Sequence, residues 1–240
     1  MTFDTDVLFF LTELAGTIAF SISGAVTAIK RGLDLFGVVF LGAVTAIGGG
    51  ILRDILLGQI PPQAFLNYVY LLVAVITGVA VFLIVYYQNQ HDKPIQVMND
   101  SILNFFDAAG LGIFSILGVQ NTMNAGFGDN IFFCVFLGMT TGVGGGMLRD
   151  VLSCSTPAVL RKHIYALTSL SGALCYYCLQ SVFASASILI STILVIVLRV
   201  LASHYRWTLP HVQLCEKCFK HPNFDTKVNK NVQEAKKLRF

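Results

Sequence analysis

Charged residues are scarce in this sequence. It contains 16 Lys and Arg and 13 Asp and Glu residues in a length of 240, or 12%, whereas average protein usage is roughly 25%. Residues 204–240 hold 11 of these charges, so the rest of the chain is poorer still. This composition disfavours a soluble globular domain. Together with a hydrophobic content of 55%, it also excludes a disordered chain and a coiled coil.

The sequence also lacks basic residues at its start and a large net charge. Met1 to Asp6 include two acids and no basic residue, so the first apolar segment is expected to remain as a membrane span and not to be a cleaved signal peptide. The net charge of +3 comes without a basic stripe that interleaves with aromatics. No nucleic-acid partner is therefore expected, and the lipid bilayer is the expected surrounding.

Long apolar windows are abundant, and windows of about 20 such residues predict an all-α polytopic membrane protein. Seven transmembrane helices are predicted: 7–29, 35–57, 65–87, 101–119, 130–152, 162–183 and 186–203. The last two are joined at Ala184-Ser185-Ala186 without a strong breaker, so six or eight spans remain alternatives. Residues 204–240 are left as a basic tail.

The positions of the basic residues predict an orientation for these helices. If the N-terminus lies outside, every Lys and Arg except Arg53 and Arg149 falls in a connection, helix end or tail on one side. Lys and Arg accumulate on the cytoplasmic side of membrane proteins. The N-terminus is therefore expected outside and the tail in the cytoplasm.

The two halves of the chain share a motif. Gly48-Gly49-Gly50-Ile51-Leu52-Arg53-Asp54 recurs as Gly144-Gly145-Gly146-Met147-Leu148-Arg149-Asp150, and upstream Glu13 matches Asp107. Each half holds three predicted spans, and three is odd, so the second copy enters the membrane facing the opposite way. We therefore predict two inverted three-helix repeats, residues 7–87 and 101–183, followed by a seventh helix at 186–203.

The glycine triplets are the first candidates for lining a transport pathway. Each glycine weakens a helix by about 1 kcal/mol relative to alanine, and interrupted helices at matching positions in two halves indicate a transport path. A helix break is therefore expected at Gly48, Gly49, Gly50, Gly144, Gly145 and Gly146. The alternative is that the glycines serve only the close packing of helices.

Ionisable residues inside the predicted spans are the second set of candidates. A bare Arg at the bilayer centre costs at least about 2.5 kcal/mol, so each one needs a partner. By depth we predict two charged layers, in which Glu13 pairs with Arg53 and Asp107 with Arg149. Asp54 and Asp150 belong to the same layers. Adjacent residues diverge by about 100° around a helix, so the Arg-Asp neighbours are not expected to form a simple salt bridge.

Alternatives to a role in transport exist for these side chains. Each Arg could reach the interface or form a purely structural ion pair. Hydroxyl groups near the triplets could add polar atoms to a pathway, or bond their own helices. The candidate pore hydroxyls are Ser21, Ser23, Thr45, Ser115, Thr140 and Thr141.

The duplicated Gly-Gly-Gly-x-x-Arg-Asp motif, three spans per inverted repeat and a seventh span resemble prokaryotic members of the trimeric intracellular cation (TRIC) channel family. Bacterial inner-membrane glycine-uptake proteins belong to the same family. The resemblance implies a homotrimer in the bacterial inner membrane, with a potassium-permeable pore in each protomer and the second and fifth helices kinked at the glycines. Animal members carry a lysine before the first triplet for a phosphoinositide; Ile47 stands there in this sequence.

These observations predict a modestly selective channel for potassium or other monovalent cations. The Thr-Val-Gly-Tyr-Gly loop of a carbonyl filter is absent, so strong selectivity for potassium over sodium is not expected. A secondary transporter for a small solute such as glycine is the alternative. An enzyme is not expected, because the histidines fall in connections or the tail without a nucleophile in a recognisable order. No cofactor is expected. Cys215-x-x-Cys218 is read as a reduced tail, with zinc as the alternative.

Overall fold

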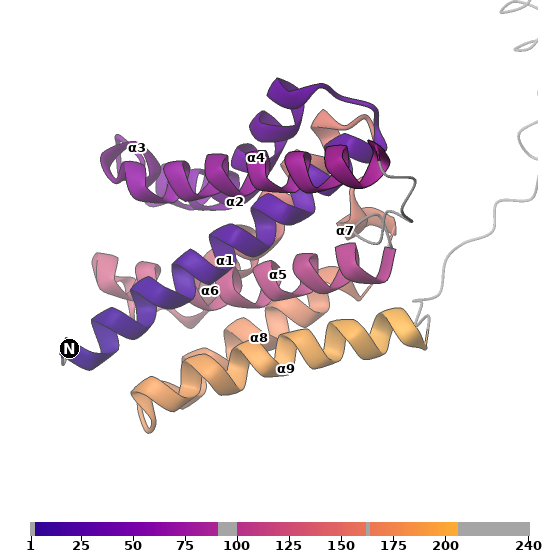
Figure 1. The fold of residues 1–240 in the computed structure, drawn as a ribbon. Helices are drawn as coiled ribbons and strands as arrows, with labels where there is room; N and C mark the ends of the chain where they lie inside the picture. Colours follow the sequence, from indigo (N-terminus) through magenta and orange to yellow (C-terminus); the bar gives the residue numbers. More distant parts are fainter. Residues whose placement is uncertain (1–2, 91–99, 162–163, 206–240) are drawn as a thin grey trace, which may run out of the picture. The chain divides into compact units, whose positions relative to one another are not determined.

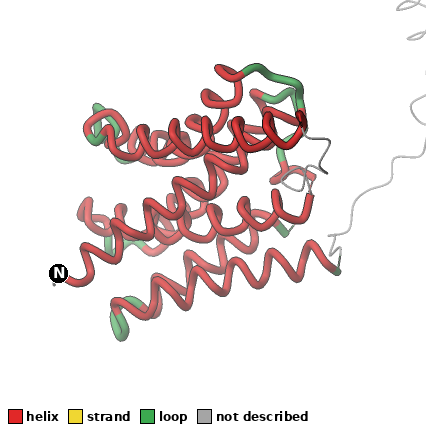
Figure 2. Tube along the Cα trace, in the orientation of Figure 1, coloured by secondary structure: helices red, strands yellow, loops and turns green. Residues whose placement is uncertain are grey.

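The computed structural model describes residues 3–90, 100–161 and 164–205, and the regular elements in this part of the chain are all helical (Figure 2). The elements are α1 (Phe3–Lys30), α2 (Leu35–Leu56), α3 (Gln63–Leu66), α4 (Tyr68–Gln90), α5 (Asp100–Thr122), the π-helix η2 (Met123–Phe127), α6 (Ile131–Leu152), α7 (Ala158–Arg161), α8 (Tyr165–Leu179) and α9 (Ala184–His204).

Six of these helical segments are long and apolar enough to cross a membrane: α1, α2, α4, α5 with η2, α6 and α9. Their bounds lie close to the predicted spans. The predicted span 162–183 corresponds to α8, which has only 15 residues and so falls short of the about 20 that a bilayer requires. A break at Gln180–Phe183 separates α8 from α9.

The N-termini of α2 and α6 are capped in the same way. The Asp34 side chain accepts a hydrogen bond from the Gly37 N–H at 2.8 Å, and the Asn130 side chain accepts one from the Phe133 N–H at 3.1 Å. Short polar side chains at this position satisfy N–H groups that have no partner inside the helix. The two helices of the duplicated motif therefore start with equivalent caps.

The helices pack in layers around α5. Figure 1 shows α2, α3 and α4 on one side, α8 and α9 on the opposite side, and α1, α5 and α6 between them. In the most apolar window of the α5 segment 61% of the residues are buried, against 22% in α4. α5 contacts α1, α6, α8 and α9. It is therefore the central helix, whereas α4 has only four buried residues and leaves large apolar side chains such as Leu72, Ile76 and Leu83 exposed, as lipid contact would require.

The C-terminal ends of α2 and α6 lie at opposite ends of the bundle. α3 follows α2 and α7 follows α6, and Figure 1 places these two short helices far apart at the two ends. The contacts between α2 and α6 agree: Gly48 approaches Leu148, and Gly144 approaches Leu52. Residue numbers rise along one helix as they fall along the other. The two Arg-Asp pairs are therefore carried to opposite ends.

Candidate functional site

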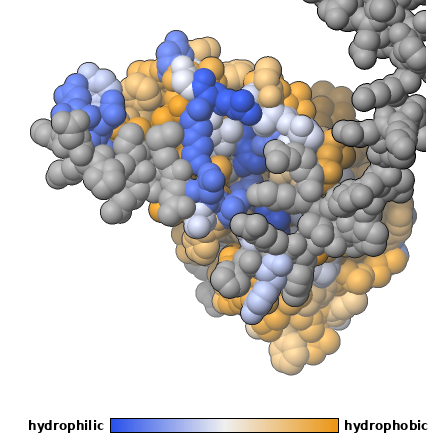
Figure 3. All heavy atoms as spheres, turned by 90° about the vertical axis from the view of Figure 1, so that its right-hand side faces the viewer, coloured by the Kyte–Doolittle hydropathy of each residue, from blue (hydrophilic) through white to orange (hydrophobic). Residues whose placement is uncertain are grey.

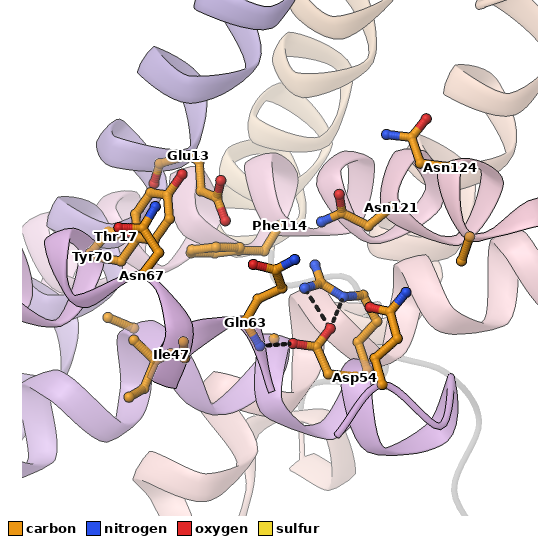
Figure 4. Close-up of a pocket in the computed structure, with 16 residues that line it drawn as sticks. Glu13, Thr17, Ile47, Asp54, Gln63, Asn67, Tyr70, Phe114, Asn121 and Asn124 are labelled. Carbon is orange, nitrogen blue, oxygen red and sulfur yellow. Dashed lines mark hydrogen bonds and ion pairs between the residues drawn. The ribbon is translucent and has the colours of Figure 1, made fainter. Parts of the chain in front are cut away.

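A polar cavity of about 380 Å³ lies at the α3 end of the bundle. We call it the Glu13 cavity. It is lined from α1 by Glu13, from α2 by Arg53 and Asp54, and from the later helices by amide and hydroxyl groups (Figure 4). These amide and hydroxyl residues are Gln63, Asn67, Tyr70, Asn121 and Asn124. The cavity thus presents oxygen atoms of several kinds to anything that enters it.

Glu13 and Arg53 share this cavity, but each has another partner. The Tyr70 hydroxyl lies close enough to hydrogen-bond the Glu13 carboxylate. Arg53 pairs instead with Asp54, at 2.7 Å from Nη2 to Oδ1. Within the described residues Glu13 makes no ion pair. The predicted Glu13–Arg53 layer therefore exists as a shared cavity and not as a direct pair, because Asp54 occupies the guanidinium.

The Arg53–Asp54 contact corrects the expectation that adjacent residues would not pair. Arg53 Nε donates to Asp54 Oδ1 at 2.8 Å, and Asp54 Oδ2 accepts from the Gln63 N–H at 2.8 Å. The 100° divergence applies to the Cβ directions, whereas the long Arg side chain folds back alongside its neighbour near the helix end. Asp54 therefore holds the arginine with one oxygen and the start of α3 with the other.

The same arrangement recurs at the end of α6. Arg149 Nε donates to Asp150 Oδ1 at 2.9 Å, and Asp150 Oδ2 accepts from the Ala158 N–H at 2.7 Å. Both residues of this second pair are buried, as are Arg53 and Asp54. The duplicated sequence motif thus forms a duplicated structural motif, in which the aspartate joins the arginine to the short helix that follows.

A second polar cavity, of about 350 Å³, lies beside this motif. We call it the Asp107 cavity. Asp107, Arg149 and Asp150 line it together with Asp100 and Asn104. Figure 3, which views the side of the bundle where α7 lies, shows hydrophilic surface between hydrophobic flanks. A polar cavity is therefore present at each end of the described bundle.

The predicted pairing of Asp107 with Arg149 is confirmed. Arg149 Nη1 lies 2.7 Å from Asp107 Oδ1, and the same nitrogen donates to Ser23 Oγ at 2.5 Å. Arg149 therefore connects α6 with α5 and α1. An arginine removed from water in this way is stable only with such partners, because an unpaired buried charge is strongly unfavourable.

The glycine triplets do not break their helices, contrary to expectation. α2 runs without interruption through Gly48–Gly50, and α6 runs through Gly144–Gly146. The backbone N–H and C=O groups of a break in the bilayer would need other partners, and each one left without a partner costs several kcal/mol. The low helix propensity of glycine, about 1 kcal/mol per residue, is therefore outweighed. The triplets instead let α2 and α6 approach each other.

The contact between these helices is reciprocal. A Cβ on Gly49 would lie within 3.0 Å of the Thr141 carbonyl oxygen, and one on Gly145 equally close to that of Thr45. Real Cβ atoms essentially never come that close. Gly50 differs, since a Cβ there would meet only Arg53 Nη2 at 3.9 Å, and it lines the Glu13 cavity. Gly49 and Gly145 are therefore required for the close approach of α2 and α6, and Gly50 is not.

Aromatic rings fill the interior between α1 and α5. Phe20 and Phe114 stack with centroids 5.2 Å apart and an interplanar angle of 17°. Phe114 lines the Glu13 cavity, and the Phe20 ring lies against Gly145 and Gly110. The Glu13 and Asp107 cavities share no lining residue. The two polar spaces are therefore separate in this structure.

The predicted pore hydroxyls mostly bond the main chain. Ser21 donates to the Ala74 carbonyl oxygen at 2.7 Å, and Ser23 is the hydroxyl that accepts from Arg149. The other four donate to the carbonyl oxygen four residues earlier in their own helix: Thr45, Ser115, Thr140 and Thr141. None of the six lines either cavity. Ser23 is thus the one that contacts a charged group of the site.

Comparison with known proteins decides the family. A sequence model of a family described as glycine transporters matches residues 10–86 and 104–181, more than half of the chain. The chain belongs to this family. Each matched range contains one copy of the Gly-Gly-Gly-x-x-Arg-Asp motif.

Similar proteins and solved structures support the same placement. The UPF0126 inner membrane protein YadS of Escherichia coli K12 is 34% identical over 214 residues, which cover 88% of this chain and 99% of YadS. A solved structure from work on conductance through TRIC cation channels has a TM-score of 0.73 at 33% identity and covers 90% of this chain and 99% of its own.

The TRIC trimeric intracellular cation channel orthologue from Rhodobacter sphaeroides has a TM-score of 0.74 at 26% identity, over 83% of this chain and 98% of its own. The resemblance to TRIC channels inferred from the motif is thus confirmed.

Several polar residues of the site had no signal in the sequence. Tyr70 is a single polar residue in an apolar span, whereas Asn121 and Asn124 follow the predicted span 101–119 and read as part of a connection, and yet all three line the Glu13 cavity. Asn124 lies in the turn after α5, where Gly126 adopts a positive φ of 93°. Tyr165 is likewise a single polar residue in an apolar span, whereas Arg199 counts from sequence as a basic residue at a helix end, and the structure buries it. Only a comparison of depth between all spans would have suggested them.

Proposed function

We propose that this protein is a potassium-permeable channel for monovalent cations, with a pathway inside each protomer that joins the Glu13 cavity to the Asp107 cavity. The observation that carries the proposal is the pair of polar, carboxylate-bearing cavities at opposite ends of an apolar helical bundle. The solved TRIC cation channels with the same fold support it. Homotrimer formation belongs to the proposal, because the resemblance implies it.

We further propose seven spans in two inverted three-helix repeats, with α8 as a short sixth span. The reciprocal contacts of Gly49 and Gly145 and the equivalent Arg-Asp motifs at opposite ends support an inverted relationship. The basic residues favour an outside N-terminus and a cytoplasmic tail in the bacterial inner membrane, where YadS is an inner membrane protein. The Glu13 cavity then faces outward and the Asp107 cavity inward.

The chemistry of the Glu13 cavity suits weakly held cations. Glu13 supplies a carboxylate without a basic partner among the described residues. Asn67, Asn121 and Asn124 add amide groups, and the Asn67 and Asn124 oxygens each also accept one hydrogen bond from the protein. Conduction requires sites that attract an ion but release it again. Glu13 fits that requirement as the one carboxylate of the cavity that is not paired with a cation among the described residues, whereas a cage of several unpaired carboxylates would favour tightly bound divalent ions.

The region between the cavities must open for ions to pass. The stacked rings of Phe20 and Phe114 and the contact at Gly145 fill this region. Apolar constrictions of this kind exclude water and gate channels by dewetting. Conduction in this proposal therefore requires the two rings to separate, and the structure corresponds to the closed state.

A carrier for a small zwitterion such as glycine is the second candidate. Glu13 and Arg53 face one cavity and could hold an ammonium and a carboxylate, and the family description favours this reading. Two separate cavities would also suit alternating access. Arg53 weakens the case, because Asp54 already binds two of its nitrogens.

The experiment that separates these functions uses purified full-length protein in liposomes and planar bilayers. Potassium current and labelled glycine uptake are measured on the same preparation, with empty liposomes as the control. We expect stepwise potassium currents and no glycine uptake above the control. Glycine accumulation without current would establish the carrier and overturn the channel.

Glu13→Gln is expected to lower the permeability ratio of potassium to chloride by about three-fold, because the cavity loses the charge that concentrates cations. Reversal potentials in a KCl gradient measure this ratio. Asp34→Asn is the matched control, since Asp34 is an exposed carboxylate that caps α2 and lines neither cavity. An equal ratio in both variants would remove Glu13 from the pathway.

A further inference from the structure

Arg199 of α9 is a buried cation that lies outside both halves of the duplicated sequence. Its side chain is 4% exposed. Arg199 Nη2 lies 3.6 Å from Asp107 Oδ2, and the guanidinium carbon lies 4.4 Å from the centre of the Tyr165 ring. Its Nε–H has no acceptor within the described residues. A buried charge with such a loose set of partners needs a reason beyond packing.

Asp107 is therefore held by two arginines from two helices. Arg149 of α6 binds one carboxylate oxygen at 2.7 Å, and Arg199 of α9 faces the other. Asp107 lines the second cavity, whereas Arg199 stands behind it. The negative charge that Asp107 presents to the cavity is consequently compensated from two sides.

The two cavities differ in how their carboxylates are compensated. At the Asp107 cavity, Lys30 pairs with Asp100 at 2.6 Å, Arg149 pairs with Asp150 as well as Asp107, and Arg199 adds a third cation for three carboxylates. At the Glu13 cavity, Arg53 is the single cation among the described residues for two carboxylates, Glu13 and Asp54. Among the described side chains the charges therefore balance at the Asp107 cavity, whereas the Glu13 cavity keeps a carboxylate without a cation.

The tyrosines at the two ends support this comparison. Ser21 donates to the Ala74 carbonyl oxygen in α4, and the matching Ser115 bonds the Ser169 hydroxyl in α8 at 2.6 Å. Ala74 and Ser169 are therefore equivalent positions, and so are Tyr70 and Tyr165, which precede them by four residues. Tyr70 can hydrogen-bond Glu13, but the buried Tyr165 hydroxyl has no partner within the described residues. At this end the carboxylate of Asp107 faces Arg199, which stacks on the Tyr165 ring.

We propose that Arg199 acts as a built-in cation of the pathway, which neutralises Asp107 and makes the two ends unequal for permeating cations. This inference depends on the proposed channel function. Cations at the Glu13 end meet a carboxylate that attracts them, while those at the Asp107 end meet none that is free. Passage at the Asp107 end then limits the current, and single channels in symmetrical KCl pass unequal currents at opposite voltages.

Single-channel recordings of the full-length protein in planar bilayers test this. Arg199→Gln is expected to raise the unitary potassium conductance about three-fold and to reduce the inequality of current between positive and negative voltage. Arg199→Lys retains the charge and should behave as the wild type. Tyr165→Phe is the matched control, because it removes a hydroxyl without a partner and keeps the ring. Conductance and rectification unchanged in Arg199→Gln would overturn the proposal.

A second comparison applies if Arg199→Gln does not yield a protein that elutes as the wild type in size-exclusion chromatography. Asp107→Asn leaves Arg199 uncompensated and should lower the cation conductance, and the double variant Asp107→Asn/Arg199→Gln should restore it. Equal conductance in the single and double variants contradicts the role of Arg199. A wild-type protein that passes no potassium current instead counts against the channel function itself.

Discussion

Gly49→Ala is expected to destabilise the folded protein by about 2 kcal/mol or more, because the added methyl group collides with the Thr141 carbonyl oxygen of α6. That oxygen belongs to a helix backbone and cannot turn away as a flexible side chain could. α2 and α6 must therefore separate, and their contacts on both sides loosen. The midpoint of thermal unfolding of the purified protein in detergent measures the loss.

Gly50→Ala is the matched control, one residue further along the same helix. Its methyl group would meet nothing closer than Arg53 Nη2 at 3.9 Å, and alanine favours the helix over glycine by about 1 kcal/mol. We expect the unfolding midpoint of Gly50→Ala to equal or slightly exceed that of the wild type. If Gly49→Ala and Gly50→Ala melt together, the close crossing of α2 and α6 is wrong.

The second large effect is expected at Arg149. Arg149→Ala removes the partner of Asp107 and Asp150 and leaves carboxylates in a buried region. Loss of one member of a buried ion pair typically costs 3 to 5 kcal/mol, and we expect about that much here. The unfolding midpoint in detergent again serves as the measurement, together with the yield of protein that elutes as the wild type.

Lys30→Ala provides the comparison for Arg149→Ala. Lys30 also bonds an aspartate, Asp100, at 2.6 Å, but the Asp100 side chain is 88% exposed. Ion pairs in water contribute about 0 to 1 kcal/mol, so the midpoint should change little. A loss in Lys30→Ala as large as that in Arg149→Ala would show that burial does not decide the strength of these pairs.

The helices could be predicted closely from the sequence because the bilayer fixes their length and composition. The predicted span 35–57 became Leu35–Leu56, and 130–152 became Ile131–Leu152. The span 162–183 differed more, since α8 covers only Tyr165–Leu179. Apolar residues continue beyond Leu179, and hydropathy does not register where a chain turns.

The role of the glycine triplets could not be settled by sequence. A run of glycine both weakens a helix and permits close contact between helices, so Gly48–Gly50 fits either outcome. The deciding factor is what lies opposite, and for Gly49 this is the Thr141 backbone, 92 positions further along the chain. Such a contact depends on how α2 and α6 cross, which no local pattern records.

Some contacts of the charged residues could be predicted from the sequence and others could not. Asp107 and Arg149 could be paired from sequence, because the duplicated motif and the span boundaries place them at one depth. The contact of Tyr70 with Glu13 and the approach of Arg199 to Asp107 depend instead on the rotation of α4 and α9 about their axes. Hydropathy leaves this rotation open, since both helices are apolar on most of their surface.

The bridging aspartates Asp54 and Asp150 constrain how the Glu13 cavity and the Asp107 cavity can widen. Asp54 links Arg53 to the first residue of α3, and Asp150 links Arg149 to the first residue of α7. The end of α2, the Arg53 guanidinium and the start of α3 are thereby linked into one unit, and the end of α6, the Arg149 guanidinium and the start of α7 into another. A movement that enlarges either cavity is therefore expected to displace the linked unit as a whole along the surfaces of α1 and α5. Bending within the unit would leave a buried carboxylate or guanidinium without its partner, which is strongly unfavourable.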